Sequence, residues 1–179
     1  MSFTPAERRS ALTDTLRQRI LILDGAMGTM VQKHHLQEDD YRGARFADRS
    51  LYPRDLKNNN DILTLSRPDL LTRIHEQYLD AGADIITTCT FSATAIGQHE
   101  FFHIAPPGPR GQEYYDGVLA DEALASLVRD INLAACRLCR SAADRAEERD
   151  GRPRWVAGSI GPMAVTASIS PNVSDPGYR

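Results

Sequence analysis

The chain has 179 residues, of which 41% are hydrophobic and 25% are charged, and its formal net charge is -3. These values are typical of a one-domain globular protein and give no basic field that would attract nucleic acid, so we expect no nucleic-acid partner. The chain has no run of the ~20 apolar residues that a membrane helix needs, and its first residues lack the apolar core of a signal peptide. Three cysteines, an odd number, argue against a disulfide framework. Together these features predict a cytoplasmic protein without membrane contacts.

The first predicted elements are a helix and a strand. Residues 4–7, Thr-Pro-Ala-Glu, have the sequence of a capping box with proline at the first helical position, which predicts a helix at about residues 5–19. The apolar run at 20–23 is ended by Asp24 and Gly25. Such a run is typical of a short strand that is buried on both faces of a parallel sheet.

A second helix and a second strand follow. The helix is predicted to open at residues 66–69, where proline follows a cap residue, and to end near Gly82 in a left-handed conformation. Residues 84–88 then have the pattern of a strand. Residues 98–118 are rich in proline, glycine and aromatic residues, which predicts an irregular loop.

The last predicted elements are a long helix at about 120–149, with an apolar stripe, and a third strand near 154–158. Parallel strands joined through helices predict an α/β fold, either an open doubly wound sheet or a (β/α)8 barrel. In both architectures the loops after the strands carry the chemistry, and here these loops begin at Asp24, Cys89 and Gly158.

Two of these loops are candidate ligand sites. Asp24 precedes glycines, which would place a carboxylate beside exposed backbone N–H groups, complementary to the two charged groups of an amino acid. The alternative is a tight turn with a capping aspartate, and the spacing misses the phosphate-binding motifs. Residues 87–92 offer hydroxyls, a thiol and the Phe91 ring to a pocket, although threonines also simply suit a strand.

Metal-ligating residues are sparse. Cys136 and Cys139 form a CxxC inside a predicted helix, where packing is the simpler interpretation, because redox CxxC motifs normally begin a helix. His99 and His103 are four residues apart and, with Cys89, leave a different metalloenzyme as one alternative function.

Several ordered motifs resemble those of the homocysteine S-methyltransferase family. Residues 22–30, Ile-Leu-Asp-Gly-Ala-Met-Gly-Thr-Met, are similar to the first strand and loop of these barrels. The other similar segments are residues 42–48, 59–68, 82–86 with Thr90 and Phe91, 157–162, 166–171 and 175–176. The resemblance is closer to the N-terminal homocysteine-binding domain of cobalamin-dependent methionine synthases than to betaine-dependent relatives.

This resemblance implies a (β/α)8 barrel that binds homocysteine at the carboxyl ends of the strands. It also implies a zinc ion, held by three cysteines, which keeps the substrate sulfur deprotonated as the nucleophile. Methylcobalamin on another module would supply the methyl group, and methyltetrahydrofolate on a second barrel would recharge the cobalamin. The expected partners are therefore homocysteine, the remainder of the barrel, and folate- and cobalamin-binding modules of the same polypeptide.

By the same resemblance, Asp24 meets the substrate amino group, the backbone of Gly25 and Ala26 meets its carboxylate, and Thr88 and Phe91 line the pocket. The family's zinc cysteines belong to later strands, beyond residue 179, so we expect no metal ligand and no catalytic residue in this chain. The chain also departs from the family, which usually has an acid and an asparagine at the positions of Thr87 and Cys89.

The whole chain, residues 1–179, is thus predicted to be a partial homocysteine-binding domain. A complete barrel of this kind needs about 250 residues, so we expect the chain to be truncated and inactive alone. The non-enzymatic alternative is a stand-alone binding or assembly module derived from a partial barrel. Its contact surface would be the loop at 101–118, which looks like an insertion relative to the family pattern.

Overall fold

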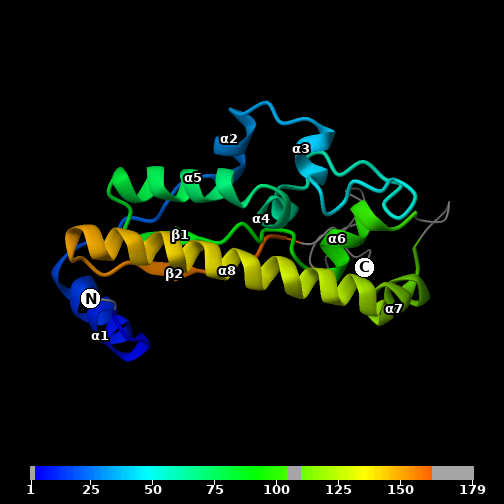
Figure 1. Cartoon of the computed structure of the whole chain (residues 1–179). Helices are drawn as coiled ribbons and strands as arrows, with labels where there is room; N and C mark the ends of the chain where they lie inside the picture. The colour runs from blue at the N-terminus through cyan, green and yellow to red at the C-terminus, as the bar shows by residue number, and fades with distance from the viewer. Residues whose placement is uncertain (1–2, 105–109, 163–179) are drawn as a thin grey trace, which may run out of the picture.

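A small parallel sheet lies at the centre of the molecule, with helices packed against it (Figure 1). The computed structural model describes residues 3–104 and 110–162, so the predicted motifs at 166–171 and 175–176 lie outside the described residues. The elements in chain order are α1 (Pro5–Gln18), α2 (Met27–Gln32), α3 (Glu38–Arg42), the 3-10 helix η1 (Asn60–Ile62), α4 (Leu63–Ser66), α5 (Pro68–Asp80), β1 (Ile85–Thr87), α6 (Ala95–Phe102), α7 (Gln112–Ala120), α8 (Glu122–Asp150) and β2 (Trp155–Ala157).

The two strands are parallel and are joined through helices, which confirms the predicted α/β class. β1 and β2 pair in register, with Ile85 opposite Trp155 and Thr87 opposite Ala157. Because parallel neighbours need a crossover, α6, α7 and α8 carry the chain from the end of β1 back to the start of β2. The carboxyl ends of both strands therefore lie at the same edge of the sheet.

The predicted strand at 20–23 is wrong as a regular strand. Only Leu23 forms an isolated parallel bridge, with Ile85, although Asp24 N–H donates to the Ile85 carbonyl at 2.9 Å. A side chain replaces part of the ladder, because the Asp84 carboxylate accepts the Ile22 N–H at 2.9 Å. This segment is also not buried on both faces as expected, since the described residue Ile22 is 53% exposed.

The predicted irregular loop at 98–118 is also wrong in part. Residues 98–102 belong to α6 and residues 112–118 to α7, while residues 105–109 lie outside the described part. Glycine weakens an isolated helix by about 1 kcal/mol, so Gly97 and Gly117 argue against helices from local sequence. Tertiary packing overrides this preference, because α6 and α7 pack against each other and both pack against α8.

The start of α1 and the ends of α5 and α8 lie where the sequence signals predict them. Thr4 and Glu7 form the capping box of α1, with Thr4 N–H donating to the Glu7 carboxylate at 2.7 Å. Gly82, after α5, and Gly151, which caps α8, have positive φ values of 105° and 71°. Such left-handed positions favour glycine because a Cβ would be strained there.

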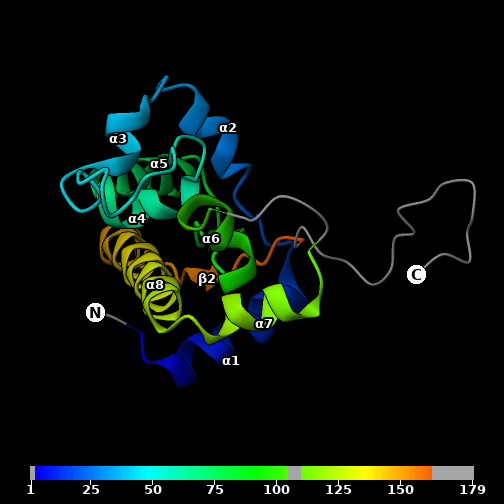
Figure 2. The ribbon, with the colours of Figure 1, turned by 90° about the vertical axis from the view of Figure 1, so that its right-hand side faces the viewer.

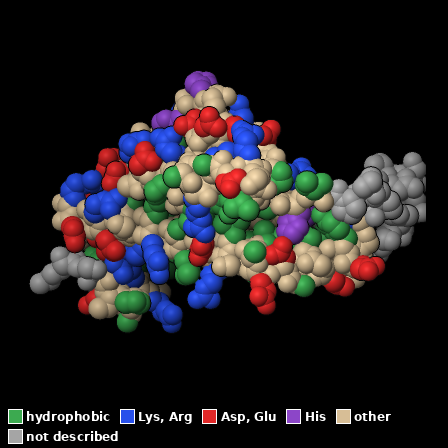
Figure 3. Space-filling view, turned by 45° about the vertical axis from the view of Figure 1, so that its right-hand side comes forward, with side chains coloured by type: hydrophobic (Ala, Val, Ile, Leu, Met, Phe, Trp, Pro, Cys, Tyr) green, Lys and Arg blue, Asp and Glu red, His purple; other side chains and the backbone are tan. Residues whose placement is uncertain are grey.

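The core lies on one side of the sheet, where α5 and α8 pack. Ile86 of β1 is fully buried among small side chains of α8 such as Ala142, Ala143 and Cys139. A second cluster of larger side chains, including Leu63, Leu71 and Ile131, joins α4, α5 and α8. On the surface, charged side chains of both signs are interspersed around a band of hydrophobic ones (Figure 3). None of the helices in the described ranges is long and apolar enough to cross a membrane.

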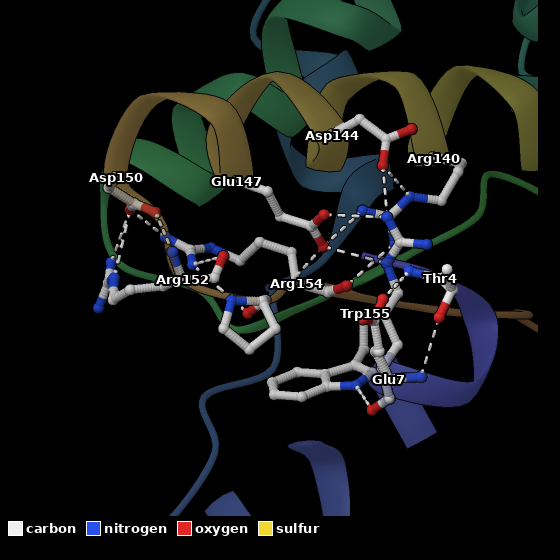
Figure 4. A network of polar contacts seen from close by, with 11 residues as sticks. Thr4, Glu7, Arg140, Asp144, Glu147, Asp150, Arg152, Arg154 and Trp155 are labelled. Carbon is white, nitrogen blue, oxygen red and sulfur yellow. Dashed lines mark hydrogen bonds and ion pairs between the residues drawn. The ribbon is translucent and has the colours of Figure 1, made fainter. Parts of the chain in front are cut away.

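Helix α1 lies on the opposite side of α8 from α2 and α3 (Figures 1 and 2). It is tied there by Arg8, which forms ion pairs with Asp144 at 2.8 Å and with Glu147 at 2.9 Å (Figure 4). The indole N–H of Trp155 in β2 donates to the Arg8 carbonyl at 2.9 Å. These contacts join α1, α8 and β2 at the amino-terminal end of the strands, away from the candidate site.

Candidate substrate site

A cavity of about 380 Å³ opens at the carboxyl end of β1. Its walls come from three separated segments, residues 25–28, residues 60–61 and residues 87–91, and from Ser159 after β2. The predicted residues Gly25, Ala26, Thr88 and Phe91 all line it. The fold therefore brings together the loops that the sequence analysis treated separately.

Asp24 does not itself line this cavity, but it is half-buried between Gly25 and Thr87, which do, and it is held by Thr87 of β1. The Thr87 N–H donates to its carboxylate at 2.8 Å, and the Thr87 hydroxyl lies 3.0 Å from the other oxygen. Burial raises the pKa of Asp24, and the hydrogen bonds from Thr87 oppose this rise. Among the described residues Asp24 has no ion-pair partner, so the site presents an acceptor that is ready for a cationic group.

Gly25 permits the close approach of an aromatic ring. A Cβ built at Gly25 would lie 3.0 Å from the hydroxyl and 3.2 Å from a ring carbon of Tyr78. Tyr78 comes from α5, and its hydroxyl lies 3.4 Å from the Ala26 carbonyl. Tyr78 was not predicted as a site residue, and the structure places it against the Asp24 loop.

Thr88 lines the cavity, but its hydroxyl is engaged within the protein. It lies 2.7 Å from the Thr90 hydroxyl and accepts the Ser159 N–H at 3.0 Å. Thr90 in turn donates to the Ser159 carbonyl at 2.8 Å. These bonds join the loops after β1 and β2, so Thr88 shapes the cavity wall more than it offers a free donor.

Phe91 forms part of the rim and is 56% exposed. It separates the cavity from a neighbouring hollow of about 320 Å³ that Phe91, Ile96 and Phe101 also line. Its carbonyl accepts the Gly161 N–H at 2.8 Å. A Cβ at Gly161 would lie 2.5 Å from two carbons of the Phe91 ring, so this ring position depends on a glycine.

Asp61 and Asn60 are site residues that the sequence analysis missed. Asp61 is 4% exposed, and burial raises its pKa to about 6 although it accepts hydrogen bonds from the backbone of Ser92 and Phe91. The Cys89 thiol donates to the Asn60 carbonyl at 3.4 Å. The sequence signals here were the polar run 58–61 and the family resemblance of residues 59–68, and neither reveals contact with a loop some thirty residues later.

The histidines and the CxxC cysteines do not join this cavity. His99 is buried, and its ring contacts the Ile96 carbonyl and Arg110, whereas His103 pairs with Asp121 at 3.0 Å. Cys136 is exposed and Cys139 is buried on α8, as expected for a CxxC inside a helix. The alternative that combines His99, His103 and Cys89 in one metal site therefore lacks the required geometry.

Comparison with known proteins identifies the family. A model of the family described as homocysteine S-methyltransferase matches residues 21–178. The chain belongs to the homocysteine S-methyltransferase family. Two crystal structures of the homocysteine methyltransferase MmuM from Escherichia coli, in metallated and oxidized forms, also match, each with a TM-score of 0.52.

The likeness to MmuM covers most of this chain but less than half of the enzyme. Sequence identity is 22% to the metallated form and 25% to the oxidized form, over 85% and 87% of this chain. In both comparisons the chain spans 41% of the Escherichia coli protein. The match begins after α1, so this helix precedes the segment that defines the family.

The zinc ion that homocysteine methyltransferases of this family imply does not fit the residues described. Within residues 3–104 and 110–162, no three His, Cys, Asp or Glu side chains come together as metal ligands. Burial holds the pKa of the Cys89 thiol well above its usual range and raises that of Cys139 to about 12, so neither is poised as a thiolate ligand.

Proposed function

We propose that this chain forms the first part of a domain that methylates homocysteine, and that its cavity binds the amino acid end of that substrate. The observation that carries the proposal is the half-buried Asp24 carboxylate, which has no ion-pair partner among the described residues. It lies next to two residues that line the cavity, Gly25, which follows it in the chain, and Thr87, which donates hydrogen bonds to it. An ammonium group beside it would favour the ionised carboxylate that burial disfavours. The substrate carboxylate would meet the backbone of Gly25 and Ala26, and Thr88 and Phe91 would shape the wall.

Within the family we propose membership of the cobalamin-dependent methionine synthases, on the resemblance of the ordered motifs. In this proposal the zinc ion, the cobalamin and the folate are held by other parts of the same polypeptide. The role of this chain is then to bind and orient homocysteine, and it is inactive alone. The span of 41% of the Escherichia coli enzyme supports a chain that holds only part of such a site.

The substrate assignment is tested by calorimetric titration of the full-length protein with homocysteine. Asp24→Asn should raise the Kd about 10- to 100-fold, since a hydrogen bond to a charged group contributes about 1.5–3 kcal/mol. Asp14→Asn, which alters an exposed acid on α1, is the matched control and should leave the Kd unchanged.

A ligand that lacks only the amino group of homocysteine isolates the Asp24 contact. Its affinity should be equally weak for the wild-type protein and for Asp24→Asn, because neither can form the ammonium pair. If Asp24→Asn weakens both ligands to the same extent, the carboxylate acts through the fold and the assignment of the amino group is wrong.

The proposed modules of methionine synthase are tested by the mass of the native polypeptide in an immunoblot against this segment. A band far above the 19.9 kDa of this chain supports them. A band near that mass would instead favour a stand-alone binding module.

A further inference from the structure

The loop that carries Phe91 is anchored on a buried acid from a distant segment. Asp61 lies in η1, 4% exposed, and its carboxylate accepts the Ser92 N–H at 2.6 Å. The Cys89 thiol lies 4.0 Å from the other carboxylate oxygen, and the backbone N–H of Phe91 lowers the pKa of Asp61. The loop after β1 is therefore held by one side chain about thirty residues earlier in the sequence.

We propose that Asp61 is a positioning residue for the substrate, because it holds the backbone of Phe91 and Ser92 and thereby fixes the Phe91 ring in the cavity wall. The inference rests on the proposed function for its ligand, since the ring position matters for binding only if the cavity holds the substrate. Asp61 also lines the cavity, but in this proposal it acts through the Phe91 loop, whereas Asp24 contacts the substrate.

The chemistry of a carboxylate suits this task better than that of a neutral side chain. An ionised carboxylate has two acceptor oxygens and can receive two adjacent N–H groups, whereas asparagine has one acceptor and would turn a donor toward the second amide. Burying the charge is unfavourable, and among the described groups no cation lowers the pKa of Asp61. The amides of Phe91 and Ser92 are therefore its main compensation.

The rest of the loop leaves Phe91 little freedom to compensate for a lost anchor. The Ser92 carbonyl accepts from the Gln98 side chain at 3.1 Å, and Gln98 also bonds Asn59 at 2.8 Å. On the other side, Gly161 lies directly against the Phe91 ring. The segment around η1 thus holds the loop through Asn59 and Asp61 together, while β2 and its loop support it from the opposite side.

The test is a double-mutant cycle in the full-length protein, with the homocysteine Kd as the readout. Asp61→Asn should raise the Kd about tenfold in the wild-type background. In the Phe91→Ala background the same substitution should have no further effect, because the ring that Asp61 positions is gone. Asp55→Asn removes an acid whose side chain is 79% exposed and is the charge-matched control.

An equal rise of the Kd in both backgrounds, or no rise in either, overturns the inference. Hydrogen exchange of the Phe91 and Ser92 amides gives a second readout that needs no ligand. These amides should exchange at least tenfold faster in Asp61→Asn than in Asp55→Asn, and equal rates would contradict the anchor.

The two readouts separate this inference from the proposed function. If the wild-type protein binds no homocysteine, the substrate assignment fails, and the exchange rates of the two amides still decide whether Asp61 holds the loop. If Asp61→Asn does not fold, Asp61→Glu replaces it in both measurements, since it keeps the charge but moves the carboxylate by one methylene.

Discussion

Glu147 should contribute strongly to stability, because its carboxylate joins three segments of the chain (Figure 4). It is 2% exposed and receives Arg8 at 2.9 Å, Arg140 at 2.8 Å and the backbone N–H of Arg154 at 2.8 Å. Removing one partner of a buried ion pair costs about 3–5 kcal/mol. Glu147→Gln keeps the side-chain volume, and Asp144 still contacts both arginines, so we expect the lower end, about 3 kcal/mol.

For a chain of this size, about 3 kcal/mol corresponds to a fall in Tm of about 6–12 °C. Thermal unfolding is followed through Trp155, the single tryptophan of the chain, whose indole bonds Arg8 and should shift its emission when α1 detaches. The control is Glu148→Gln, because Glu148 is the next residue of α8 and is exposed. Equal Tm values for the two variants would refute the reasoning.

The pH dependence provides a further check on Glu147. Burial alone would raise its pKa, but the hydrogen bonds from Arg8 and Arg154 and the charges of Arg140 and Arg8 together lower it. A depressed carboxyl pKa contributes stability that is present above the unfolded-state value and lost as the pH falls through the folded-state value. The difference in unfolding free energy between wild type and Glu147→Gln should therefore shrink below about pH 4.5.

Two other predictions concern the site and the core. Gly161→Ala would place a Cβ 2.5 Å from the Phe91 ring, so it should destabilise the protein by about 1–3 kcal/mol and raise the homocysteine Kd. A Cβ at Gly158 would have no atom within 4 Å, so Gly158→Ala should change neither the stability nor the Kd. Equal effects in the two variants would contradict the packing argument. Burial lowers the pKa of His75 to about 4 and raises that of Asp61 to about 6, so between pH 6 and pH 4 protonation should destabilise the fold through His75 and stabilise it through Asp61. When the pH is lowered from 6 to 4, the free energy of unfolding should therefore fall less in His75→Gln than in the wild type, and more in Asp61→Asn. Each difference should be about 1 kcal/mol per pH unit. Parallel pH profiles for the three proteins would exclude these opposite effects of His75 and Asp61.

Helices could be predicted where the signals were local. The capping box of Thr4 and Glu7 acts within one turn, and the left-handed turn at Gly82 needs no distant partner. The prediction of a strand at 20–23 was wrong, because an apolar run forms a regular strand only where neighbouring strands complete its hydrogen-bond ladder. β1 offers a partner on one side, and the Asp84 carboxylate takes the N–H of Ile22.

The candidate site was predictable only in the parts that follow the strands. Asp24 and Phe91 lie at such ends, and the polarity of their neighbours indicates a cavity there. Asp61 and Tyr78 come from η1 and α5, so their places depend on how these helices pack onto the loops. No periodicity or spacing within one segment carries that information.

Binding and folding make the same demand on the open side of the sheet. Parallel sheets are normally covered on both faces, and α5 and α8 fully bury Ile86 on one of them. Beside β1, Ile22 and Leu23 remain 53% and 55% exposed, directly before the Asp24 carboxylate. Elements that covered these apolar side chains would also dry the surroundings of Asp24, which would strengthen its attraction for an ammonium group. In our proposal the remainder of the domain does both, so homocysteine affinity and the stability of the sheet should rise together.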